Sequence, residues 1–206
     1  MKVIAFSLAA LLAVLLSTAA HADLLLGPSF ITPTTNISAG GFGSIYEIAD
    51  GIGLETDGPP YNGYGPDAKS GIITLTLNGP YRIFSFLIAN DINVQTEGVK
   101  DFQLRFYDAA NTLLHTTGTL TANDETIPAQ TFTVGGAEGI NNVSRVEFEV
   151  FNVYELNPNP AVWRIEVREV AFNGTAVPEP TTTLLLLSAS LVLVALSRRQ
   201  RRTESV

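Results

Sequence analysis

The chain of 206 residues has room for one ordinary domain and contains no cysteine, so disulfide bonds and thiol chemistry are excluded. Its formal net charge is −8, but residues 23–177 alone carry 18 acidic and 7 basic side chains, a balance of −11. Such an acidic surface repels phosphate backbones, and we therefore expect no nucleic-acid binding.

The N-terminus has the pattern of a secretory signal peptide. Lys2 supplies a positive charge, residues 3–16 are apolar apart from Ser7, and Ala20 and Ala22 place small residues where signal peptidase reads them. The apolar run is short for a membrane span, which needs about 20 residues, and this argues against a buried helix or an uncleaved anchor. We expect residues 1–22 to form a helical signal peptide that signal peptidase removes after Ala22.

The central part, residues 23–176, alternates apolar and polar residues in short runs, as β-strands do. The clearest run is 145–151, where Val146, Phe148 and Val150 alternate with charged residues. Further strands are predicted at 72–77, 81–89, 102–106, 112–117, 130–134 and 163–172, with turns at 78–80 and 108–111. Short strands without a convincing helix or repeat predict an all-β fold, an antiparallel β-sandwich.

The central part offers little for catalysis. His115 is its only histidine and lies in a predicted hairpin strand, and no serine stands in a nucleophile-elbow context. Its 18 acidic residues offer many carboxylate pairs for glycoside hydrolysis, but nothing marks one pair out. We expect no catalytic residue and keep weak glycan hydrolysis as an alternative.

Residues 48–58 form a glycine-containing segment with Asp50, Glu55, Thr56 and Asp57. Carboxylates, a threonine hydroxyl and backbone carbonyls together suit Ca²⁺, which takes about six to eight oxygen ligands. The spacing does not match an EF-hand loop, and a plain acidic surface turn is the alternative.

Residues 59–65 form a Gly/Pro-rich segment that contains Tyr61 and Tyr64. Tyrosines in such loops can stack on sugar rings and form hydrogen bonds through their hydroxyls, so these two residues are candidate ligand contacts. The alternative is an ordered loop that is packed by its own aromatic side chains.

Glu169 is an anomaly in the last predicted strand, 163–172. Strict alternation puts it on the apolar face and turns three other charged residues to water, namely Arg164, Glu166 and Arg168. A β-bulge near Arg168 would return Glu169 to solvent and turn Val170 and Phe172 inward. Otherwise the inward carboxylate needs a partner such as a cation, because burying an unpaired charge is costly.

The central part also resembles discoidin-like, galactose-binding-like jelly rolls. Similar segments occur in the same order at 46–51, 98–104, 130–132, 143–148 and 165–172. The resemblance implies an antiparallel jelly-roll β-sandwich, often with a structural Ca²⁺ held by an Ala-Asp-Gly turn, a threonine and a glutamate on the final strand. Those positions are Asp50, Thr56 and Glu169 here. The tryptophan that commonly follows the Asp-Gly turn is missing, since the only tryptophan is Trp163.

The composition changes sharply at Val177, where the last segment, 177–206, begins. Its motif is Pro178, Glu179 and Pro180, and a basic cluster ends it: Arg198, Arg199, Arg201 and Arg202. Residues 181–197 between them are uncharged and predict a transmembrane helix near the lower length limit of about 17 residues. The arginines place the helix end in the cytoplasm, and a simple tail anchor is one interpretation.

The segment 177–206 closely resembles the PEP-CTERM sorting signal of Gram-negative bacteria. The resemblance implies recognition by an exosortase, a membrane transpeptidase, and export to the cell envelope, cell surface or extracellular matrix. Together the two resemblances imply a non-catalytic surface or matrix protein that binds exopolysaccharide. A structural or adhesive scaffold without a small-molecule ligand is the alternative.

Overall fold

The computed structural model describes residues 23–25, 27–37, 40–54, 63–90, 98–124, 128–154 and 164–178. The chain divides into two compact units, Met1–Thr175 and Ala176–Val206. In the described part no helix is long and apolar enough to cross a membrane. The predicted signal peptide, 1–22, and the predicted transmembrane helix, 181–197, lie outside that part.

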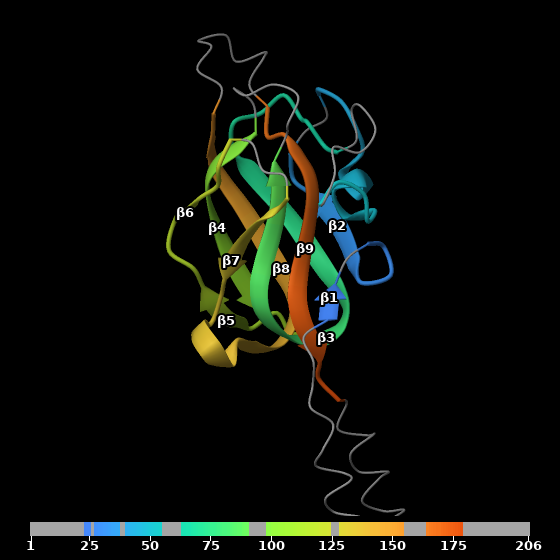
Figure 1. Cartoon of the computed structure of the whole chain (residues 1–206), viewed down its shortest axis with the longest axis vertical. Coiled ribbons are helices and arrows are strands. Elements are labelled where there is room, and N and C mark those ends of the chain that lie inside the picture. The colour runs from blue at the N-terminus through green and yellow to red at the C-terminus, as the bar shows by residue number, and fades with distance from the viewer. Residues whose placement is uncertain are drawn as a thin grey trace, which may run out of the picture. The chain divides into compact units, whose positions relative to one another are not determined.

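The first unit is built from antiparallel strands and two short 3-10 helices (Figure 1). The strands are β1 (Asp23–Leu25), β2 (Ile31–Thr35), β3 (Gly71–Asn90), β4 (Val99–Tyr107), β5 (Leu113–Thr116), β6 (Leu120–Thr121), β7 (Gln130–Thr133), β8 (Ile140–Val153) and β9 (Val167–Ala176). The 3-10 helices are η1 (Ile45–Ala49) and η2 (Gly136–Glu138). The prediction of an all-β, antiparallel sandwich is confirmed.

All nine strands belong to one hydrogen-bonded sheet, in the order β1-β9-β3-β8-β4-β5, with β2 and β7 also on β3 and β6 on β4. The sheet becomes two layers because β3 bends (Figure 1). The first part of β3 pairs with β2 and β8, and its last part pairs with β7. The register with β8 shifts between Thr76 and Tyr81, where Pro80 has no N–H to donate. We call this corner, residues 77–83, the β3 bend.

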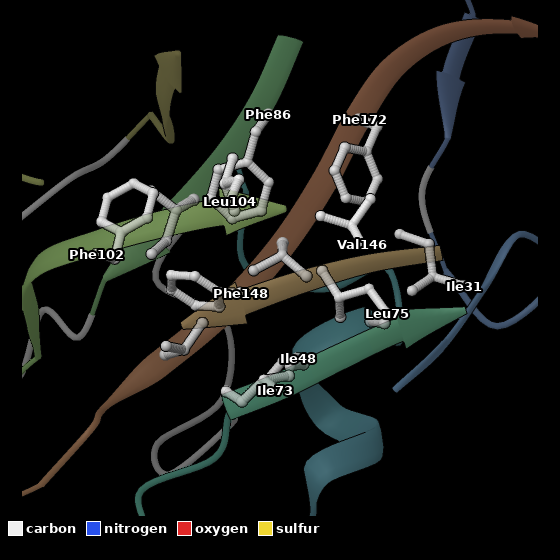
Figure 2. Close-up of a cluster of buried hydrophobic side chains, with 14 of the residues drawn as sticks. Ile31, Ile48, Ile73, Leu75, Phe86, Phe102, Leu104, Val146, Phe148 and Phe172 are labelled. Carbon is white, nitrogen blue, oxygen red and sulfur yellow. The ribbon is translucent and has the colours of Figure 1, made fainter. Parts of the chain in front are cut away.

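The core lies between the two layers and is rich in phenylalanine (Figure 2). Phe86 of β3 lies 5.9 Å from Phe102, 5.4 Å from Phe148 and 5.5 Å from Phe172, measured between ring centroids. All four side chains are fully buried. Tilted ring pairs at these distances add to the large apolar area that each ring removes from water.

Most predicted strands appear at their expected places. The predicted hairpin of residues 102–117 is confirmed, since β4 and β5 pair across the turn at 108–111. The predicted strand at 145–151 lies inside the longer β8, with Val146, Phe148 and Val150 buried. The prediction of two strands separated at 78–80 is wrong, because residues Gly71–Asn90 form one continuous strand through the β3 bend. The local turn residues produce a corner there rather than a break.

A network of ion pairs covers the outer face of β4 and β8. The carboxylate of Glu147 accepts hydrogen bonds from Arg105 at 3.1 Å, from Arg145 at 2.5 Å and from the hydroxyl of Tyr107 at 2.8 Å. Arg105 also pairs with Glu149, and the guanidinium of Arg145 lies 3.8 Å from the ring centre of Tyr107. Partial burial alone would raise the pKa of Glu147, but the hydrogen bonds from Arg145, Tyr107 and Arg105 outweigh it and lower that pKa.

Replacement of Glu147 by glutamine tests how much this network contributes to the free energy of unfolding. A carboxyl whose folded pKa is depressed stabilises the fold above its unfolded pKa, and this contribution is lost as the pH falls through the folded pKa. We expect Glu147→Gln to lower the free energy of unfolding at neutral pH by about 1 kcal/mol and to have a smaller effect near pH 3. Urea unfolding measures both values. Glu138→Gln, at an exposed glutamate of η2, is the control, and equal effects of the two variants would contradict the expectation.

Candidate functional site

The candidate site begins at the end of η1. Ser44 caps this helix by accepting a hydrogen bond from the N–H of Tyr46, and Ile48 and Ala49 anchor it in the core. Asp50 follows as the C-terminal cap, and its Oδ1 accepts from the N–H of Ile52 at 2.9 Å. Gly51 between them has a φ of +94°, a conformation that glycine adopts without strain. The turn therefore holds the carboxylate of Asp50 in a fixed direction.

Glu169 on β9 meets this turn from the other side. Its side chain is fully buried, and its Oε2 accepts from the same N–H of Ile52 at 3.1 Å. Two carboxyl groups that are 119 positions apart in the chain thus converge on one backbone donor. The second oxygen of Glu169, Oε1, is buried and has no hydrogen-bond partner. An unsatisfied buried carboxyl oxygen is costly, and a proton on the carboxyl group, which also hydrogen-bonds with Asp50, or a cation would reduce this cost.

The electrostatics of this pair are unfavourable for two negative charges. Burial is the largest cause that raises the pKa of Glu169, the charge of Asp50 raises it further, and the pKa reaches about 9. At neutral pH Glu169 is therefore protonated unless a positive partner is present. The site has two ways to remove the repulsion, a proton or a cation.

The side chains that converge here offer carboxylate oxygens, which hard cations prefer to soft transition metals. The described residues contain no cluster of three or more His, Cys, Asp or Glu side chains that could hold a metal ion. Two carboxylates therefore require further oxygen ligands from backbone carbonyls or hydroxyls, as Ca²⁺ accepts and zinc sites rarely use. Thr56, the third ligand implied by the resemblance, lies outside the described residues.

The charged residues beside Glu169 differ from the prediction. Glu166 and Arg168 were expected to point to water, but their side chains are 5% and 2% exposed. By strand alternation Arg168 shares the face of Val170 and Phe172, which face the core, and Glu169 lies on the opposite face. That opposite face is covered by the chain around Asp50, so β9 is buried on both sides there.

The β-bulge explanation for Glu169 is wrong, because it required this side chain to return to solvent and the side chain is fully buried. Val170 and Phe172 are buried as well, so the buried carboxylate lies in a strand that is covered on both faces. Sequence reasoning missed Glu166 and Arg168 as buried neighbours of the site. The available signal was weak: Glu166 stands between the apolar residues Ile165 and Val167, and Val170 follows soon after Arg168, and frequent apolar residues are typical of a strand covered on both faces.

Of the two candidate tyrosines, the structure describes one. Tyr64 is 7% exposed, forms a bridge with Val167 through two backbone hydrogen bonds of 2.9 and 3.1 Å, and hydrogen-bonds with Thr35. Burial accordingly raises the pKa of its hydroxyl. This geometry favours the alternative of a loop packed by its own aromatic residue at Tyr64. Tyr61 lies outside the described residues.

The second unit contains the sorting motif. Pro178 is exposed, whereas Glu179, Pro180 and the four arginines lie outside the described residues. Residues 176–202 match the family model of the PEP-CTERM protein-sorting motif. No curated protein sequence matches the chain significantly.

Several solved structures that are similar to this chain are carbohydrate-binding modules. One is the family 32 module of Streptococcus pneumoniae EndoD, with a TM-score of 0.55 and 13% identity over 73% of this chain and 98% of that chain. The family 32 module of C. perfringens NanJ, solved in complex with galactose, has a TM-score of 0.54 and 10% identity over 73% of this chain and 98% of that chain. A module from a family 31 glycoside hydrolase of Clostridium perfringens has a TM-score of 0.54 and 14% identity over 73% of this chain and 94% of that chain.

At these identities the similarity defines the fold, and it confirms the jelly roll predicted from the discoidin-like segments. The chain carries a PEP-CTERM sorting motif at residues 176–202 behind a domain with the fold of family 32 carbohydrate-binding modules.

Proposed function

We propose that this chain is an exported, non-catalytic surface or matrix protein that binds polysaccharide and is processed at its tail by an exosortase. The observation that carries the proposal is one chain with both a sorting motif and a carbohydrate-binding-module fold. The acidic balance of −11 in residues 23–177 favours neutral or cation-bridged glycans over strongly anionic ones. A signal peptide at 1–22, cleavage after Ala22 and a Gram-negative host belong to the same proposal.

We also propose that Asp50 and Glu169 hold a structural Ca²⁺, with Thr56 as a further ligand. The support is the buried Oε1 of Glu169 without a partner and the convergence of two carboxyl groups on the N–H of Ile52. A bound Ca²⁺ would supply the positive charge that lets both carboxyl groups ionise. The role is structural, since the ion would tie the turn after η1 to β9.

Polysaccharide binding is tested by retention of the purified full-length chain on immobilised exopolysaccharides. We expect retention on at least one neutral polymer. Tyr61→Ala should weaken it several-fold, because an aromatic ring can provide much of the contact with a sugar face. Phe151→Ala, at an exposed aromatic residue of β8, is the matched control. Absence of retention on every polymer would favour the scaffold alternative, and release of reducing sugar would favour the hydrolase.

The calcium site is tested by thermal unfolding in excess Ca²⁺ and in chelator. A ligand that binds only the folded state stabilises it by about 2.7 kcal/mol at a concentration of 100 times its Kd. We expect Ca²⁺ to raise the Tm of the wild-type chain and to leave the Tm of Glu169→Gln unchanged. Glu138→Gln should respond like the wild type. Identical wild-type curves in saturating Ca²⁺ and in chelator would exclude the site.

The raised pKa of Glu169 predicts a pH dependence in chelator. A group with a raised folded pKa binds its proton more tightly in the folded state, so its contribution is complete below the unfolded pKa and is lost as the pH rises towards about 9. We expect the free energy of unfolding to fall with rising pH by up to about 1.4 kcal/mol per unit. In Glu169→Gln this component should disappear. Urea unfolding at several pH values measures it, and parallel curves for the two proteins would contradict the pKa shift.

A further inference from the structure

A hollow of about 550 Å³ lies at the end of the sandwich that contains the β3 bend. Its lining comes from β5, from the loop around η2 and from the start of β8: Leu114, His115, Gly135, Gly136, Gly139, Ile140 and Asn141. Small-molecule sites commonly have volumes of about 300–1,000 Å³. The hollow therefore has room for a small ligand.

The hollow is separate from the site at Asp50 and Glu169. A Cβ atom on Gly139 would lie 2.7 Å from the backbone oxygen of Ile83, which places this wall against the β3 bend. On β9, the residue that approaches the bend is Gly174, whose added Cβ would lie 2.9 Å from the oxygen of Arg82. Glu169 lies five residues further along β9, a distance of about 17 Å in a strand.

The local backbone explains why the hollow remains open. Three glycines of the loop around η2 line it, and all have positive φ, at +67°, +64° and +65° for Gly135, Gly136 and Gly139. Residues with side chains rarely adopt this conformation, so one wall consists of peptide groups. Asn142 of β8 also has a positive φ, +62°, where the register with β3 is irregular. At this irregular start of β8, the backbone at Asn141 departs from regular pairing with β3.

The opposite wall presents an imidazole. His115 pairs with Phe106 across β4 and β5, and their rings lie 6.1 Å apart, which fixes the position of the imidazole. Leu114 beside it is 38% exposed although it is apolar. Asn141 is exposed and contributes an amide. The hollow thus combines two apolar side chains, Leu114 and Ile140, with two side chains that each donate and accept hydrogen bonds.

The chemistry of this lining selects a class of ligand. No Asp, Glu, Lys or Arg lines the hollow, so a charged ligand would find no counter-charge there. Apolar contacts next to mixed donors and acceptors suit a sugar ring, which has C–H faces and a rim of hydroxyls. We propose that this hollow is a second binding site, for one or two units of a neutral saccharide. Two sites on one domain would let it cross-link polysaccharide chains.

The test is a titration of the ¹⁵N-labelled full-length chain, in a sugar-free detergent, with lactose, cellobiose and diacetylchitobiose. We expect at least one disaccharide to shift the backbone amide signals of Leu114, His115 and residues 139–141. Because the loss of one hydrogen bond costs about 0.5–1.5 kcal/mol, His115→Ala should raise the Kd measured from these shifts about two- to tenfold. Asn141→Asp, which keeps the shape and adds a charge, should also raise it.

Thr116→Ala is the matched control, because Thr116 is the exposed neighbour of His115 on β5. It should leave the Kd unchanged. The inference is overturned if no disaccharide shifts these signals, if His115→Ala and Thr116→Ala have equal effects, or if glucuronate shifts them more strongly than the neutral sugars. Retention of His115→Ala on polysaccharide columns reports on the proposed function separately, so the two proposals can fail independently.

Discussion

The fold depends on the contact that Phe86 makes between the two layers of one bent sheet. Its ring packs on Phe102 and Phe148 in the facing layer and on Phe172 of its own layer (Figure 2). The bend in β3 shifts the register of its hydrogen bonds with β8, so the backbone pairing at the bend does not itself favour the bent form. Burial of apolar surface between the two parts of the strand outweighs this cost, since large aromatic rings each remove much area from water.

The same packing determines the chemistry of β9. Phe172 lies on the face of this strand that packs in the core against Phe86, and the chain after η1 covers the other face. Charged residues on β9 and directly before it are therefore removed from water, as Arg168, Glu169 and Glu166 are. Desolvation next to Asp50 makes Glu169 a carboxyl group that must bind either a proton or a cation. A pair of this kind links a turn to a strand through one shared backbone donor.

The charged and polar side chains of the domain differ between its flat outer face and its strand ends. On the outer face of β4 and β8, Arg105 and Arg145 neutralise Glu147 and Glu149, so this face presents paired charges. The β3 bend and the irregular start of β8 instead leave an uncharged hollow beside His115. Strand ends and corners interrupt the regular pairing of backbone groups, and this is why they can form sites.

The sequence by itself determined the strands whose two faces differ, such as residues 145–151, and the hairpin of 102–117, because alternation and turn residues are local signals. It also determined the tail motif and marked Asp50 and Glu169 as unusual. Only the tertiary structure decided that both carboxyl groups meet at the N–H of Ile52, that Arg168 is buried and that residues 71–90 form one bent strand. These outcomes depend on which distant segment covers a given face of a strand. The alternation of apolar and polar residues within one strand does not specify the segment that packs on its other face.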